Sequence, residues 1–265
     1  MENKDIIVFA GTTEGRLLCR WLLEGGYQVS ACVATGYGEC MLRDQAGLTI
    51  YTGRLDEEEL SAFLRGHRPA LVLDATHPYA VRITKYLKEA CDGLGIRCLR
   101  VLREKEKTIQ IPENLSYYSY DTLEEASRFL EKQRGRILVT TGCQELLELS
   151  QSGIETKRLI ARVLPSEQSL LCCTRAGLAP GQIIGMQGPF STELNLALIR
   201  QYEISFLLTK ESGAAGGFQE KLQAALQAGI SVVAVRRPAE SVGFTLEEIK
   251  ERAEELLGKE EENGV

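Results

Sequence analysis

The chain has little of what marks a metal, nucleic-acid or membrane protein. It contains only two histidines, and none of its eight cysteines forms a CxxC pair or lies at metal-ligand spacing from a histidine. We therefore expect no metal site and interpret the cysteines as reduced, structural residues. The formal net charge of −6 argues against nucleic-acid binding, which needs a basic face to displace counterions. No apolar run approaches the roughly 18 residues that span a bilayer, so we expect no membrane partner.

Two signatures of common nucleotide-dependent enzymes are also absent. No stretch matches the GxxxxGK[ST] loop of nucleotide kinases, and no tyrosine has a lysine four residues later, as short-chain dehydrogenases usually do. The N-terminus enters an apolar strand without the basic region and long apolar core of a signal peptide, so we expect a cytoplasmic protein. With 265 residues, of which 44% are apolar and 26% charged, the chain is globular and long enough for two domains.

Short apolar strands alternate with longer amphipathic segments along most of the chain. This alternation predicts right-handed β-α-β units and parallel sheets. A charged stretch at residues 103–115 interrupts it, so we predict two Rossmann-like α/β domains with an interdomain cleft. The first domain would cover residues 1–104. The second would cover residues 105–265 and include a C-terminal helix capped by Thr245. The expected strands are 6–10, 28–33, 48–51, 70–73, 96–101, 136–140, 156–163, 182–185, 204–208 and 230–235.

The first strand runs into the segment GTTEGR, residues 11–16, and then into a helix. A glycine turn before a helix N-terminus is an anion site, because free backbone amides and the helix dipole both point at the ligand. The match to the dinucleotide fingerprint GxGxxG is incomplete, since Thr13 and Arg16 occupy the second and third glycine positions. An ordinary strand-to-helix turn that uses glycine for its backbone freedom is the alternative.

The ends of the second and third strands indicate which dinucleotide would bind. An NAD-binding domain normally carries an acid about 20 residues after the glycines, where it holds the ribose 2′-hydroxyl. Here the second strand ends in residues 34–38, ATGYG, with no acid at its tip, and Arg54 follows the third strand. Thr35 and Arg54 suit a 2′-phosphate and so favour NADPH over NADH. For Arg54 a solvated loop arginine is the alternative.

The fourth strand ends in the segment DATHPY, residues 74–79. In a doubly wound sheet of order 3-2-1-4-5 this strand lies beside the first strand, so the segment would face GTTEGR on the nicotinamide side of a dinucleotide. Thr76 and Pro78 have the residue types of a helix cap and of a first helical turn. His77 and Tyr79 are less easily explained by structure alone, because such sheets bind ligands at the carboxyl ends of their strands.

The segments GTTEGR and DATHPYA together resemble the precorrin-6A and cobalt-precorrin-6A reductases of corrin-ring biosynthesis. The resemblance continues through residues 141–142 (TG), 188–191 (GPFS) and 209–218 (TKESGAAGGF), and it covers roughly residues 5 to 240. It implies an NADPH-dependent reduction of one ring double bond in an anionic tetrapyrrole with many carboxylates, in cobalamin (vitamin B12) biosynthesis. Whether the substrate is metal-free or carries cobalt stays open.

The resemblance also implies roles for individual residues. Thr35 and Arg54 would contact the adenosine end of NADPH. Thr76, His77 and Tyr79 would border the nicotinamide and the substrate. The residues that would line the pyrophosphate are Gly11, Thr12, Thr13, Glu14 and Gly15. The second-domain residues that would bind the substrate's carboxylates are Thr141, Gly142, Ser191, Lys210, Ser212 and Gly213.

The reduction also requires a proton on the carbon next to the one that receives the hydride. His77 is the expected catalytic donor, because histidine ordinarily titrates near neutral pH. Tyr79 is the second candidate, and a proton from solvent is the third. Lys210 could alternatively be an ordinary surface lysine at a strand end. For the whole chain, the alternative function is a non-catalytic NADP-binding sensor of the same fold.

Overall fold

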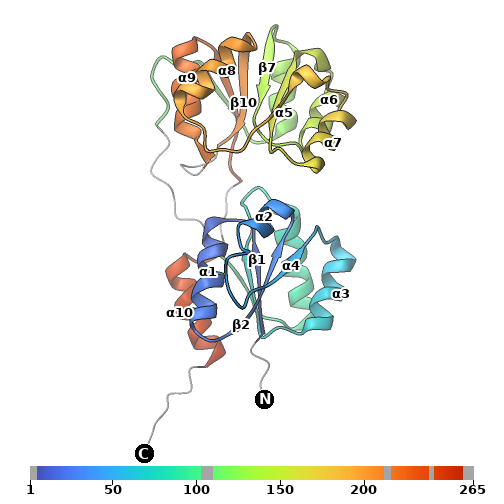
Figure 1. The fold of residues 1–265 in the computed structure, drawn as a ribbon, viewed down its shortest axis with the longest axis vertical. Coiled ribbons are helices and arrows are strands. Elements are labelled where there is room, and N and C mark those ends of the chain that lie inside the picture. Colours follow the sequence, from blue (N-terminus) through green and yellow to red (C-terminus); the bar gives the residue numbers. More distant parts are fainter. Residues whose placement is uncertain (1–4, 103–109, 212–215, 239–241, 259–265) are drawn as a thin grey trace, which may run out of the picture. The chain divides into compact units, whose positions relative to one another are not determined.

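The computed structural model describes residues 5–102, 110–211, 216–238 and 242–258 (Figure 1). The chain forms two compact units, one made of residues 1–104 with 239–265 and the other of residues 105–238. Each unit contains a parallel sheet that is covered by helices on both faces, which confirms the predicted α/β class. None of the described helices is long and apolar enough to cross a membrane.

The first unit is built on a five-stranded parallel sheet of order β3-β2-β1-β4-β5, which is the predicted order. All residues of β4 are buried, because helices cover this strand on both faces of the sheet. The strands are β1 (Asp5–Ala10), β2 (Gln28–Val33), β3 (Thr49–Thr52), β4 (Leu71–Ala75) and β5 (Cys98–Arg100).

Helices lie on both faces of this sheet (Figure 1). They enclose two separate apolar cores. On one face, α1 (Thr13–Glu24) packs beside α10 (Leu246–Leu257). On the other face, α3 (Glu57–His67) packs beside α4 (Val81–Leu94). The short helix α2 (Gly36–Cys40) follows β2.

The last helix belongs to the first unit, whereas we had predicted it in the second domain. Ile249 and Ala253 of α10 are fully buried in the core that also holds Leu18 and Leu22 of α1. The chain before the helix is fixed there as well, since the N–H of Leu102 donates to the carbonyl of Phe244 at 2.7 Å. The position of a helix in the sequence does not show which apolar surface it will cover. Here the apolar face of α10 packs against α1. The predicted cap at its start, with Thr245 and Glu248, is confirmed.

The second unit is built on a six-stranded parallel sheet of order β6-β11-β10-β7-β8-β9. We did not predict β6, an edge strand of sequence YYSY whose residues are all at least partly exposed. The predicted strand at 156–163 begins with a 3-10 turn (Thr156–Arg158), so only its second half is a strand. The strands are β6 (Tyr117–Tyr120), β7 (Arg136–Val139), β8 (Leu159–Val163), β9 (Ile183–Gly185), β10 (Ile204–Lys210) and β11 (Ser231–Val235).

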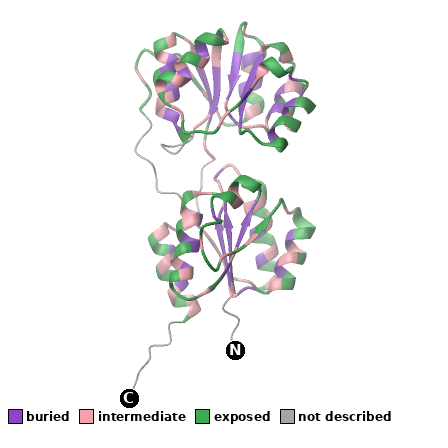
Figure 2. Ribbon diagram, in the orientation of Figure 1, coloured by how far each residue is buried: buried purple, intermediate pink, exposed green. Residues whose placement is uncertain are grey.

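The helices of the second unit also lie on two faces. The first face is covered by α5 (Leu123–Glu131), α6 (Leu146–Gln151) and α7 (Glu167–Arg175). The second is covered by α8 (Thr192–Gln201) and α9 (Phe218–Ala228). A second 3-10 turn (Pro180–Gln182) precedes β9. In both units the inner strands of the sheet are buried, and the outer faces of the helices are exposed (Figure 2).

Candidate functional site

The candidate site lies where β1 and β4 end side by side. The two strands pair with Ala10 opposite Ala75. The helices that follow them, α1 and α4, cover opposite faces of the sheet. A doubly wound sheet has its switch point at such a place, where the two loops diverge and leave room for a ligand. The loops predicted to bind the cofactor therefore stand at the expected ligand position of this fold.

The loop after β1 is fixed to the end of β4 through the carbonyl of Ala75. The N–H of Gly11 and the hydroxyl of Thr12 both donate to this carbonyl, at 3.2 and 3.0 Å. The hydroxyl of Thr12 also accepts from the N–H of Gly15 at 3.2 Å and thereby caps α1. Thr12 thus holds the loop in shape, whatever contact it makes with a cofactor.

Two glycines of this loop permit close approaches that a side chain would prevent. A Cβ on Gly11 would lie 3.3 Å from the backbone nitrogen of His77. A Cβ on Gly15 would lie 2.9 Å from the Cα of Ala10, closer than real contacts allow. Gly15 therefore lets α1 pack tightly on the strand, which is the role of the third glycine in the dinucleotide fingerprint. Thr13, at the second glycine position, is exposed in the first turn of α1.

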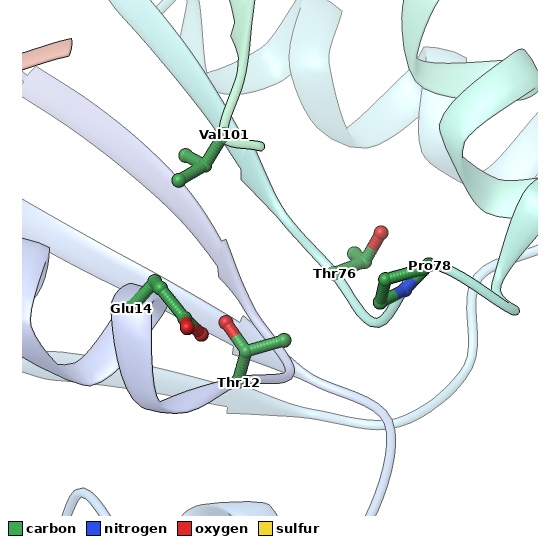
Figure 3. Close-up of a pocket in the computed structure, with 5 residues that line it drawn as sticks. All are labelled: Thr12, Glu14, Thr76, Pro78 and Val101. Atoms are coloured by element: carbon green, nitrogen blue, oxygen red, sulfur yellow. The ribbon is translucent and has the colours of Figure 1, made fainter. Parts of the chain in front are cut away.

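A small cavity lies beside the two loops (Figure 3). Its volume of about 10 Å³ is close to that of one water molecule, so it is a corner of the site and not a cofactor cavity. Glu14 brings a carboxylate from α1 to this corner, while the end of β5 closes it. The residues that line it are Thr12, Glu14, Thr76, Pro78 and Val101.

A buried ion pair fixes the loop after β4. Asp74 and Arg100 are opposite each other on the neighbouring strands β4 and β5. Nη1 of Arg100 lies 2.7 Å from Oδ1 of Asp74, and their side chains are 13% and 2% exposed. The same Oδ1 accepts from the hydroxyl of Thr76 at 2.7 Å and from its N–H at 3.1 Å. The network therefore positions the segment that begins at Thr76.

Sequence reasoning assigned no role to Asp74 or Arg100. A signal was present, because an acid inside the apolar run LVLDA needs a buried partner of opposite charge. The partner could not be identified from the sequence, since it depends on the register between β4 and β5.

The predicted capping roles of Thr76 and Pro78 are wrong. Helix α4 begins only at Val81, and its N-cap Ala80 makes no side-chain cap. The hydroxyl of Thr76 is drawn into the Asp74–Arg100 network, where it also lies 3.2 Å from the hydroxyl of Thr84. Pro78 is buried in the loop before the helix and lines the small cavity.

His77 and Tyr79 lie together at the half-buried end of this loop. Their rings stack with centroids 5.5 Å apart and an angle of 20° between the ring planes. Nδ1 of His77 accepts from the N–H of Tyr79 at 3.4 Å. In a neutral ring with this hydrogen bond the proton is on Nε2, whereas the acidic, imidazolium form carries a proton on both nitrogens.

Thr35 and Arg54 follow strands that pair with each other, β2 and β3. The hydroxyl of Thr35 caps α2 by accepting from the N–H of Gly38 at 3.2 Å, and Arg54 is exposed. Sequence reasoning missed Glu39 of α2, whose carboxylate accepts from the hydroxyl of Thr52 at 2.9 Å. Hydrogen bonds from Thr52 and Arg43 lower the pKa of Glu39, so it brings an anionic group to the end of β3.

The predicted substrate residues of the second unit lie at strand ends of its sheet. Thr141 and Gly142 follow β7, and the buried hydroxyl of Thr141 has no hydrogen-bond partner among the described residues. Lys210 ends β10 and forms an ion pair with Glu145, so these two loops are neighbours. Ser191 caps α8 by accepting from the N–H of Leu194 at 3.3 Å. Ser212 and Gly213 fall outside the described residues.

Known proteins resemble this chain over most of its length. Residues 5–256 match the family described as "Precorrin-6x reductase CbiJ/CobK". A cobalt-precorrin-6A reductase of Salmonella typhimurium is 34% identical over 241 residues, which cover 90% of this chain and 89% of the relative. A cobalt-precorrin-6A reductase of Priestia megaterium is 30% identical over 256 residues, which cover 96% of this chain and 98% of the relative.

Two further similarities are to a precorrin-6A reductase and to a solved structure. A precorrin-6A reductase of Sinorhizobium is 29% identical over 242 residues, with 91% of this chain and 88% of the relative covered. The solved structure of CobK precorrin-6A reductase superposes with a TM-score of 0.69 at 22% identity, covering 96% of this chain and 97% of that one. At this identity the structural match supports the fold, with its two parallel sheets.

Replacing Arg100 with methionine should lower the free energy of unfolding of the first unit by about 3–5 kcal/mol, because Asp74 would stay buried without its cation. Trp21, the chain's single tryptophan, packs against the core of this unit. Its fluorescence during urea unfolding therefore measures the effect.

The control is Arg82→Met on the exposed start of α4, which should change the free energy of unfolding by about 0.5 kcal/mol at most. Adding Asp74→Asn to Arg100→Met should recover part of the loss, because the double variant has no unpaired carboxylate. A loss below about 1 kcal/mol for Arg100→Met alone would show that the ion pair does not hold the loop.

Proposed function

The chain belongs to the precorrin-6x reductase family, and on this premise we propose that it reduces one ring double bond of precorrin-6A or cobalt-precorrin-6A to the 6B form, with NADPH as the reductant. The observation that carries the proposal is the family match over residues 5–256. The reaction belongs to cobalamin biosynthesis and takes place in the cytoplasm, in keeping with eight free cysteines.

The loop at the end of β1 suits the pyrophosphate of a dinucleotide. The first backbone N–H groups of α1 have no carbonyl partners within the helix. Among them, the N–H of Gly15 donates to the hydroxyl of Thr12. Without a side chain at Gly11, a ligand and the loop after β4 can both come close to the backbone. A reduced nicotinamide, when bound, supplies a hydride from its C4. The chain's contribution is to hold the acceptor carbon of the substrate in line with that position.

Thr35 and Arg54 support NADPH as the cofactor. Arg54 offers a planar, charged fork to a 2′-phosphate, and Thr35 stands at the N-terminus of α2. The carboxylate of Glu39 nearby is a competing element, because an acid in this region would suit a ribose hydroxyl. The cofactor preference therefore depends on whether Arg54 outweighs Glu39.

His77 is the proposed proton donor. In its protonated, imidazolium form the ring can deliver the proton on Nε2 to the carbon next to the one that takes the hydride, and a neutral imidazole is left. The stacked ring of Tyr79 restricts the imidazole to one plane, which favours a fixed direction of transfer. Hydride and proton together add two hydrogens across one double bond, and NADPH leaves as NADP⁺.

The second unit would bind the carboxylates of the tetrapyrrole. Thr141 offers a buried hydroxyl that has no hydrogen-bond partner among the described residues. Gly142 has a φ of 112°, a backbone conformation that favours glycine. Lys210 offers a cation that a substrate carboxylate would share with Glu145. Ser191, Ser212 and Gly213 are proposed by resemblance alone.

Membership in a reductase family favours this enzyme over a non-catalytic NADP-binding sensor. A sensor would bind NADPH without consuming it. Purified protein supplied with NADPH should instead convert precorrin-6A or cobalt-precorrin-6A, with loss of the substrate's extended-conjugation absorbance and oxidation of an equal amount of NADPH. Testing both substrates side by side also decides between the metal-free and cobalt forms. Tight NADPH binding with no spectral change on either substrate would favour the sensor.

Arg54→Ala should weaken NADPH binding by about 10- to 100-fold, because a charge-assisted contact to phosphate is lost, and should leave NADH binding nearly unchanged. Dissociation constants from titration calorimetry measure both. Arg65→Ala removes an exposed arginine from the last turn of α3 in the same unit and serves as the matched control. Equal affinity of the unmodified protein for NADPH and NADH would contradict the assignment of a 2′-phosphate site.

His77→Ala should lower kcat by about 10²- to 10⁴-fold, as expected for loss of a general acid, with little change in NADPH affinity. Tyr79→Phe is the matched variant, because it keeps the stacked ring and removes only the hydroxyl. Unchanged turnover in His77→Ala would remove His77 from the chemistry. A large loss in Tyr79→Phe would transfer the role to Tyr79.

A further inference from the structure

Two cationic side chains are buried at the carboxyl edge of the second sheet. Arg162 is the fourth residue of β8 and Lys221 is the fourth residue of α9. Each exposes only 6% of its surface. Charged side chains are seldom buried to this degree unless a group of opposite charge accompanies them.

The described partners of both cations are neutral. Nη1 of Arg162 donates to Oδ1 of Asn195 at 2.7 Å, and the ring of Phe190 lies 4.0 Å from the guanidinium carbon. Nζ of Lys221 donates to the hydroxyl of Thr209 at 3.3 Å. Among the described residues neither cation forms an ion pair, although Arg162 and Lys221 influence each other electrostatically.

The charge in this part of the core is not balanced. Burial, with a smaller contribution from Arg162, lowers the pKa of Lys221 to about 8, and Glu220 acts in the opposite direction. Burial lowers the pKa of Arg162 to about 10. Glu220, the neighbouring residue of α9, therefore offsets part of the charge of Lys221. A ligand with a negative charge would restore the balance.

We propose that Arg162 and Lys221 form a subsite that binds one carboxylate arm of the tetrapyrrole, an inference that rests on the proposed function. Both side chains have N–H groups left for a carboxylate, since Lys221 uses one of three donors and Arg162 donates through one of its nitrogens. Lys221 lies near the start of α9, where the helix dipole favours an anion. The pair also stands at the carboxyl ends of parallel strands, where ligands of such sheets bind.

The position of Asn195 supports a prepared site. Its Oδ1 accepts from Arg162, while its amide nitrogen donates to the carbonyl of Ser191 at 2.8 Å. Asn195 is 1% exposed, so its own orientation is fixed by packing. The guanidinium is thereby held in one place by a neutral group, and its charge stays available for a ligand.

A purely structural role of Arg162 and Lys221 and a ligand-binding role predict different effects on stability. If the cations served only to join α8 and α9 to the sheet, removing one of them would destabilise the protein. If they await an anion, a neutral side chain of similar length at Lys221 removes a buried charge that Glu220 offsets only in part, and the free protein should lose no stability. Ligand affinity should then fall without a loss of stability.

The test uses the full chain with Lys221→Met, and with Lys221→Arg as the variant that keeps the charge. The probe is uroporphyrin, a stable tetrapyrrole with carboxylate arms on every pyrrole ring. Lys221→Met should weaken uroporphyrin binding and raise the KM for the precorrin substrate by about 10-fold or more. It should leave NADPH affinity unchanged and should not lower the melting temperature. Lys221→Arg should retain most of the binding. Lys157→Met, at a lysine whose side chain is 81% exposed in the same unit, is the matched control and should change none of these.

The outcomes separate the subsite from the proposed function. A lower melting temperature of Lys221→Met, with probe affinity and KM unchanged, would overturn the subsite and leave the pair a structural one. Turnover of a precorrin with an unchanged KM in Lys221→Met would overturn the subsite while the proposed function stands. Loss of uroporphyrin binding in Lys221→Met, in a protein that reduces neither precorrin, would support an anion subsite and overturn the proposed function.

Discussion

One backbone carbonyl, that of Ala75, joins the two loops on which the candidate site depends. It accepts from the N–H of Gly11 and from the hydroxyl of Thr12, so the turn before α1 is fixed to the end of β4. The missing side chain of Gly11 then lets the backbone of His77 approach the same turn. A shift of either loop would displace the other. The groups proposed for the pyrophosphate and for proton transfer are therefore held as one structure.

Much of this arrangement could be predicted from the sequence because it follows from local patterns. The apolar runs of β1 and β4 and the helices after them imply a doubly wound sheet, and in such a sheet these two strands are neighbours. The position of GTTEGR opposite DATHPY follows from that order. The cap formed by Thr245 and Glu248 is likewise local, since both residues lie within one helical turn.

What could not be predicted depends on contacts between distant parts of the chain. The pairing of Asp74 with Arg100 depends on strand register, and this pairing explains why Thr76 turns back to the strand instead of capping α4. The place of α10 in the first unit depends on the shape of α1, to which its apolar face fits. Glu39 was missed because it approaches the end of β3 from a helix and not from a strand tip.

The two units treat buried charge differently, and the difference bears on function. In the first unit Asp74 has its cation, so the charge serves to hold a loop. In the second unit the described hydrogen bonds of Arg162 and Lys221 go to neutral groups, and the proposed carboxylate ligand would balance their charge.

The central claim, that this chain transfers a hydride to a corrin precursor, is tested most directly by deuterium transfer. With NADPH that carries deuterium at the reactive position of C4, mass spectrometry of the product should show one deuterium for each ring reduced. Product without deuterium, or NADPH that stays bound and unconsumed with both precorrin-6A and its cobalt form, would contradict it.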